Sequence, residues 1–177
     1  MLFSMGVRWH PIFNDDLPFR IMPSEWLEPC YCGPAPTSGH PANHALNWFL
    51  DHNRLGPSCR YLILADDDFY EPEFFSKVDR HDGDLLVCSM NRGHHQPASG
   101  PQHGTSRLIA AQENLVVCKV GCEQLIISGA RLQDLRFSSG PTADGILIEE
   151  LARHHKFEFV PEAELWFNYL EMGRWDR

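Results

Sequence analysis

The fold of this chain is decided by residues 61–72, which read YLILADDDFYEP. The first five residues of this stretch, 61–65, form a continuous apolar run, which is typical of a strand buried on both faces of a sheet. Three aspartates follow directly, and in open α/β sheets ligands bind at the carboxyl ends of the strands. The stretch therefore predicts a buried strand that brings Asp66, Asp67 and Asp68 to a ligand-binding edge.

Three adjacent carboxylates favour a bound cation at this edge. Like charges repel one another, and a hard divalent cation removes that cost. Mg²⁺ and Mn²⁺ prefer carboxylate oxygens and leave coordination positions open for phosphate oxygens. We therefore expect Asp67 and Asp68 to be metal ligands. The alternative is a solvated turn, because aspartate is a common turn residue.

Strands and helices alternate along the rest of the chain. Apolar runs predict further strands at residues 7–13, 84–90, 114–119, 124–128, 157–160 and 164–169. Apolar residues at helical spacing predict helices at 40–55, 72–81, 131–135 and 142–156, and Pro- and Gly-rich loops at 18–39 and 91–107 separate them. This order predicts one α/β domain over residues 1–177, built around a mixed central sheet.

Composition and charge exclude several classes of partner. The chain has 177 residues, and 15 Lys and Arg against 24 Asp and Glu give a formal net charge of −9. No basic run is present, so we expect no nucleic-acid partner. No apolar run reaches the roughly 18 to 20 residues that a membrane span needs, and residues 1–5 are too short for a signal peptide. We expect a cytoplasmic protein.

The six cysteines favour reduced thiols over a zinc site. A cytosolic protein keeps its thiols reduced, and free cysteine behaves as a small apolar residue in a core. The pairs Cys30/Cys32 and Cys118/Cys122 lack the two-residue spacing of a zinc knuckle. Cysteines buried in the core are therefore the better interpretation.

The setting of the three aspartates resembles the DXD-like metal motif of GT-A-fold glycosyltransferases of the family-2 type. An apolar strand precedes the motif, Pro72 follows its last aspartate by four residues, and a helix bearing Asn43 comes earlier in the chain. The likeness continues through residues 121–128 (GCEQLIIS), 142–151 (TADGILIEEL) and 166–175 (WFNYLEMGRW). It implies a single-domain, three-layer α/β/α fold with a mixed central sheet. That fold would be N-terminally short: it would lack the first strand and helix of its nucleotide-binding half, of which only residues 7–16 remain.

The resemblance also implies a function. A sugar would pass from a nucleotide-diphosphate donor to a glycan or small-molecule acceptor, with Mn²⁺ or Mg²⁺ as cofactor. The acidic residue that opens the late helix, Asp144, would be the catalytic base. Four further residues would contact the donor: Asp15, Asp16, Asn43 and Asp66.

The chemistry of sugar transfer suits these residues, but alternatives remain. A metal stabilises the negative charge on the departing phosphate, and a carboxylate accepts the proton that the acceptor hydroxyl loses. Asp144 has a structural alternative as a helix N-terminal residue that accepts backbone N–H groups. Two other functions stay open: a non-catalytic GT-A-like binding module or truncated remnant, and a metal-dependent phosphate-ester enzyme that uses the same aspartates.

Overall fold

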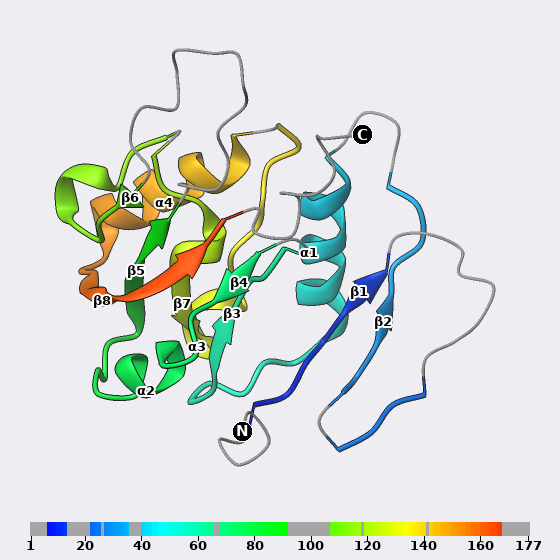
Figure 1. Ribbon diagram of the computed structural model, residues 1–177. Helices are drawn as coiled ribbons and strands as arrows, with labels where there is room; N and C mark the ends of the chain where they lie inside the picture. The colour runs from blue at the N-terminus through cyan, green and yellow to red at the C-terminus, as the bar shows by residue number, and fades with distance from the viewer. Residues whose placement is uncertain are drawn as a thin grey trace, which may run out of the picture.

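The computed structural model describes residues 7–13, 22–25, 27–35, 40–65, 68–91, 107–117, 119–140 and 142–167. In this part of the chain a curled mixed sheet carries helices on both faces (Figure 1). Its strands lie in the spatial order β3 (Arg60–Leu62), β7 (Leu125–Ser128), β5 (Leu85–Asn91), β8 (Glu158–Trp166) and β4 (Phe69–Tyr70), and β6 (Arg107–Leu108) pairs with the end of β5. β5 is parallel to β8 and antiparallel to β7, so the predicted α/β class and mixed sheet are confirmed.

β5 is the central strand, and its side chains alternate between two cores. Leu85 and Val87 belong to the larger core, while Leu86 and Cys88 belong to the smaller one on the opposite face. All four side chains are buried because paired strands flank β5 and helices cover both of its faces. Burial raises the pKa of the Cys88 thiol to about 12, so this cysteine is an apolar core residue, as expected.

Helices of unequal size cover the two faces. α1 (Pro41–His52), α3 (Gly129–Leu132) and α4 (Ala143–His154) contribute to the larger core. α2 (Phe74–Val78) covers the opposite face with Phe74 and Val78. In the described residues, a layer of helices therefore covers one face of the sheet, and the short helix α2 covers the other.

Amide side chains join α1 to the segment that follows α3. Pro41 opens α1 at a position where its missing N–H costs nothing. The Asn47 amide exchanges two hydrogen bonds with the Phe137 backbone, each 2.8 Å long. At the end of the helix, the backbone and side-chain nitrogens of Asn53 both donate to the carbonyl oxygen of Phe49. These contacts hold α1 against residues 133–140.

Two predicted strands differ from the structure. One is shorter than expected and lies at the sheet edge, and the other is replaced by local hydrogen bonds. The strand expected at 61–65 forms only at Arg60–Leu62, where it is half-buried at the sheet edge, so burial on both faces is wrong. The strand expected at 114–119 is also not formed by its described residues, 114–117 and 119. A 3₁₀ helix, η2 (Gln112–Asn114), occupies its start, and the Val117 N–H donates to Glu149 Oε1 at 2.8 Å in place of a neighbouring strand.

The two strands expected at 157–160 and 164–169 form one strand, β8. Its pairing with β5 shifts register between Cys88 and Ser89, so that Pro161, Glu162 and Ala163 form a bulge in which the first two side chains are exposed and Ala163 is buried. The Ser89 hydroxyl donates to the Pro161 carbonyl at 2.9 Å, which stabilises the bulge from the buried side. One strand therefore passes through a stretch that contains proline.

The first predicted strand lies outside the main sheet. In the range 7–13, only Ile12–Phe13 is a strand (β1), and it pairs in parallel with β2 (Cys30–Tyr31) as a separate two-stranded sheet. This small sheet lies beside α1 (Figure 1). The predicted helices at 40–55, 72–81 and 142–156 are present with shorter bounds, and α3 begins two residues before the helix predicted at 131–135. In the described residues no helix is both long and apolar enough to span a membrane.

A histidine between two glutamates joins the loop before β5 to β8. His81 Nδ1 lies 2.6 Å from Glu158 Oε1, and His81 Nε2 lies 3.2 Å from Glu162 Oε1. The hydrogen bond with Glu158 raises the pKa of His81 and lowers that of Glu158. The pKa of Glu162 is lowered by its own backbone N–H and then by His81. The charged forms of all three groups therefore stabilise the folded chain.

This cluster predicts a stability effect with a defined pH window. Because the pKa of His81 is raised on folding, its contribution is fully present below about pH 6.5 and is lost as the pH rises through the folded-state value. The glutamate pKa values are lowered, so their contribution is lost as the pH falls below about 4.5. His81→Gln should therefore lower Tm most between these limits, and least at about pH 9.

The matched control is His40→Gln, because the His40 side chain is exposed and makes no capping hydrogen bond to α1. Thermal unfolding of both variants at about six pH values, compared with the parent chain, measures the effect. A deficit for His81→Gln that stays constant with pH, or that grows as the pH rises, would contradict the assignment.

Candidate functional site

The structure describes three of the seven residues predicted for the site: Asn43, Asp68 and Asp144. The other four lie outside the described residues, and their predicted roles stay predictions: Asp15, Asp16, Asp66 and Asp67. The geometry of the site is therefore built from Asp68 and Asp144, together with the side chains that the fold brings between them.

Asp68 lies at the turn between β3 and β4. It is 6% exposed, and its backbone N–H donates to the Ala65 carbonyl at 3.3 Å, which closes the turn. Two residues later, in β4, the Tyr70 hydroxyl lies 3.1 Å from the Ile63 carbonyl oxygen and 3.2 Å from the Glu123 carbonyl oxygen. A phenol has one hydrogen to donate, so these two carbonyls share it. Tyr70 thereby connects the end of β3 with the segment before β7.

Negative and polar groups surround this phenol. Burial is the main cause that raises the pKa of Tyr70 well above its ordinary value, and the nearby acidic groups of Cys88, Glu123, Asp68 and Cys122 raise it further. Tyr70 is therefore a neutral hydrogen-bond donor at physiological pH.

A short 3₁₀ helix, η3 (Cys122–Gln124), carries Cys122 and Glu123 to the same end of the sheet. Buried Gln124 fixes this helix: its Nε2 donates to the Cys88 carbonyl at 2.9 Å, and its Oε1 accepts from the Gly121 N–H at 3.2 Å. The Gln124 amide thus attaches η3 to the central strand, and this attachment holds the backbone of Cys122 and Glu123 in place.

Asp144 approaches η3 from the first turn of α4. Its Oδ1 accepts the Gly145 N–H at 2.8 Å, which is the helix-terminal role given above as the structural alternative. A carboxylate oxygen of Asp144, one of Glu123 and the Cys122 sulfur lie within 4.8 Å of one another. We call Asp68, Glu123 and Asp144 the carboxylate cluster: Glu123 and Asp144 converge on Cys122, and Tyr70 joins the segment of Glu123 to the end of β3, from which the chain leads to Asp68.

The Cys122 thiol is buried against these carboxylates. Burial is the first cause that raises the pKa of Cys122 well above its ordinary value, followed by the charges of Glu123 and Asp144 and a hydrogen bond to Glu123. In the cation-free protein Cys122 is therefore a protonated thiol rather than a thiolate nucleophile.

Asn43 holds two segments of the fold together. Its Nδ2 donates to the carbonyl oxygens of Ser138 at 3.0 Å and Gly140 at 3.1 Å. These bonds attach the first turn of α1 to the segment that leads into α4. Contact between Asn43 and a nucleotide donor stays a prediction, and the amide nitrogen already has a structural role.

Sequence reasoning did not assign roles to Tyr70, Cys122 and Glu123. A signal for Glu123 was present, because it lies two residues before the apolar run at 125–127 just as Asp68 closely follows the run at 61–65. In an antiparallel pair, the start of one strand meets the end of the other. Once β3 and β7 are known to pair antiparallel, Glu123 falls beside the aspartate turn.

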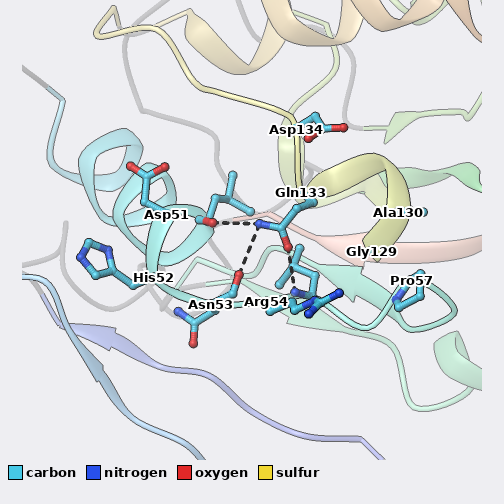
Figure 2. Close-up of a pocket in the computed structure, with 11 residues that line it drawn as sticks. Asp51, His52, Asn53, Arg54, Pro57, Gly129, Ala130, Gln133 and Asp134 are labelled. Carbon is cyan, nitrogen blue, oxygen red and sulfur yellow. Dashed lines mark hydrogen bonds between the residues drawn. The ribbon is translucent and has the colours of Figure 1, made fainter.

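A pocket of about 620 Å³ lies at the opposite end of the sheet, where α1 ends and α3 begins (Figure 2). Gln133 lines it, but its amide is committed to the fold: Nε2 donates to the Leu50 and Asn53 carbonyls, and Oε1 accepts the Leu55 N–H at 2.8 Å. The Gly129 N–H donates to the Cys59 carbonyl here, at the start of β3 and away from the carboxylate cluster. We therefore locate the chemistry at the cluster and not in this pocket.

Comparisons of the chain with protein-family models, with curated proteins and with solved structures found no match. The functional argument therefore depends on the residues and geometry given above.

The link through Tyr70 predicts a stability cost for Tyr70→Phe. Removing the hydroxyl leaves two partly buried carbonyls without this donor, so we expect the free energy of unfolding to fall by about 1 to 3 kcal/mol. Tyr61→Phe is the comparison variant, since the Tyr61 hydroxyl is half-buried and accepts one hydrogen bond from the Gly56 N–H. Urea unfolding measures both variants, and a loss for Tyr70→Phe no larger than for Tyr61→Phe would contradict the linking role.

Proposed function

We propose that this chain is a metal-dependent glycosyltransferase domain of the GT-A type, which transfers a sugar from a nucleotide-diphosphate donor to an acceptor hydroxyl. One observation carries the proposal: Asp144 reaches Glu123 at the end of the sheet where Tyr70 links Glu123 to the Asp68 turn. Two residues 76 positions apart, each expected to serve this chemistry, thus belong to one polar centre.

The aspartate turn suits a hard divalent cation. A carboxylate as buried as that of Asp68 is costly unless hydrogen bonds or a cation offset the lost hydration. Carboxylate oxygens are the ligands that Mn²⁺ and Mg²⁺ prefer. We propose that Asp67 and Asp68 hold the cation and that Asp66 contacts the donor. When bound, the cation would offset the negative charge on the departing nucleotide diphosphate.

Asp144 has the geometry that a general base needs. The Gly145 N–H holds Oδ1, so the orientation of the carboxylate is set, and the other oxygen, Oδ2, lies on the side of Gly121 and Glu123. In the proposed reaction, this carboxylate accepts the proton of the acceptor hydroxyl as the hydroxyl oxygen attacks the sugar. Asp15, Asp16 and Asn43 remain proposed contacts to the donor, and the acceptor is a glycan or a small molecule.

The first test is binding of metal and nucleotide. With Mn²⁺ present, one of the UDP-, GDP- or CDP-linked sugars should stabilise the chain by about 2.7 kcal/mol at a hundredfold excess over its Kd. For a protein of this size, each kcal/mol of stabilisation raises Tm by about 2 to 4 °C. Asp67→Ala should lose the effect, and Asp82→Ala, which alters an exposed aspartate before β5, should keep it. Absence of stabilisation by every nucleotide would refute the transferase and favour a non-catalytic binding module.

The second test separates the base from the helix-terminal role. Asp144→Asn should retain nucleotide binding and lose about 10²- to 10⁴-fold in the rate of sugar transfer or donor hydrolysis. Asp82→Asn is again the matched control. An unchanged rate would show that Asp144 only serves the helix terminus. Metal-dependent release of phosphate from simple esters, without sugar transfer, would favour the phosphate-ester enzyme.

A further inference from the structure

Cys122, Glu123 and Asp144 form a group of ligand atoms that differs in kind from the aspartates after β3. The sulfur of Cys122 and one carboxylate oxygen from each of the other two residues lie within 4.8 Å of one another. Cys122 is buried, while Glu123 and Asp144 are partly exposed. One soft donor and two hard donors therefore converge from η3 and α4, and we call these three residues the thiol–carboxylate triad.

The spacing of the triad is near that of a tetrahedral metal site. Zinc bonds of about 2.3 Å to sulfur and about 2.1 Å to oxygen place adjacent ligand atoms about 3.4 to 3.6 Å apart. The atoms of the triad need to approach one another by at most about 1.4 Å to reach this geometry. Because the Glu123 and Asp144 side chains are partly exposed, small rotations of these side chains can provide that movement.

Gly121 allows the Glu123 carboxylate to pack against the backbone close to Asp144. A Cβ added to Gly121 would clash with Glu123 Oε2 and would lie 3.6 Å from Asp144 Oδ2. Its backbone has no positive φ that would require glycine, so the missing side chain matters here for space. Glycine at this position therefore lets the Glu123 carboxylate lie against the backbone on the side of Asp144, which brings the two carboxylates of the triad together.

We propose that the thiol–carboxylate triad binds a thiophilic divalent cation of the Zn²⁺ type, at a site separate from the Mn²⁺ or Mg²⁺ expected at Asp67 and Asp68. Thiolate ligands select Zn²⁺ over Mg²⁺ and Mn²⁺, which prefer oxygen ligands alone. Three protein ligands leave the fourth tetrahedral position for water or a substrate oxygen. Binding forms a metal–sulfur bond and breaks the S–H bond of Cys122, and the proton passes to the buffer without electron transfer.

The site has a consequence for catalysis, and this consequence alone rests on the proposed function. A cation held by Asp144 occupies the carboxylate that accepts the proton of the acceptor. Zn²⁺ should therefore inhibit sugar transfer, while Mn²⁺ supports it. Binding of the thiophilic cation to the triad does not require the chain to be a transferase.

Titration of the full chain with Co²⁺ tests the inference, because Co²⁺ replaces Zn²⁺ at such sites and absorbs light through charge transfer from thiolate. We expect a near-ultraviolet charge-transfer band that saturates at one Co²⁺ per chain and disappears when Zn²⁺ is added. Cys122→Ser should abolish the band. Glu123→Gln and Asp144→Asn, which keep the thiol and the side-chain shapes, should weaken Co²⁺ binding at least about 10- to 100-fold.

Two cysteine variants outside the triad serve as matched controls. Cys59→Ser changes an exposed thiol at the start of β3, and Cys32→Ser changes a half-buried thiol next to β2. Both should keep the charge-transfer band. The inference fails if the parent chain shows no band, if Cys122→Ser retains it, or if Glu123→Gln and Asp144→Asn both bind Co²⁺ as tightly as the parent. A saturable band in a chain that transfers no sugar would support the triad and refute the transferase.

Discussion

The antiparallel position of β7 between β3 and β5 is the constraint on which the rest of the structure depends. Arg60 pairs with Ser128 on one side of β7, and Leu85 pairs with Ile127 on the other. Because β7 runs opposite to both neighbours, its start meets their ends. The 3₁₀ helix η3, which precedes β7, therefore lies beside the end of β3, where the chain continues toward Asp68. Gln124 strengthens this arrangement by joining η3 to the backbone of β5.

The same constraint makes one corner of the molecule both polar and rigid. The Tyr70 phenol shares its hydrogen between carbonyls of the β3 and β7 segments, and α4 brings Asp144 to η3 from a third direction. Carboxylates held this closely need cations or hydrogen-bond donors, since their mutual repulsion is otherwise destabilising. The proposed hard cation at the aspartate turn and the proposed thiophilic cation at the triad meet this need by different ligand chemistry.

Helices and buried strands could be predicted from the sequence to the extent that their hydrogen bonds are local or their apolar pattern is strong. α1 and α4 have apolar residues at helical spacing, and β5 and β7 are continuous apolar runs. Residues 114–119 also have an apolar pattern, but their described part, 114–117 and 119, forms no strand, and a carboxylate from distant Glu149 accepts the Val117 N–H instead. A single-sequence pattern contains no information about a partner 32 residues away.

The sequence by itself determined the α/β class, the two large helices and the acidic character of the turn after residue 65, because these follow from apolar periodicity and from adjacent like charges. Only the tertiary structure decided that β3 is an edge strand, that Cys122 and Glu123 converge with Asp144, and that Tyr70 joins Glu123 to the end of β3. Strand order and direction set these distances. Strand order and strand direction both depend on which surfaces pack together over the whole chain, and no local stretch of residues specifies that choice.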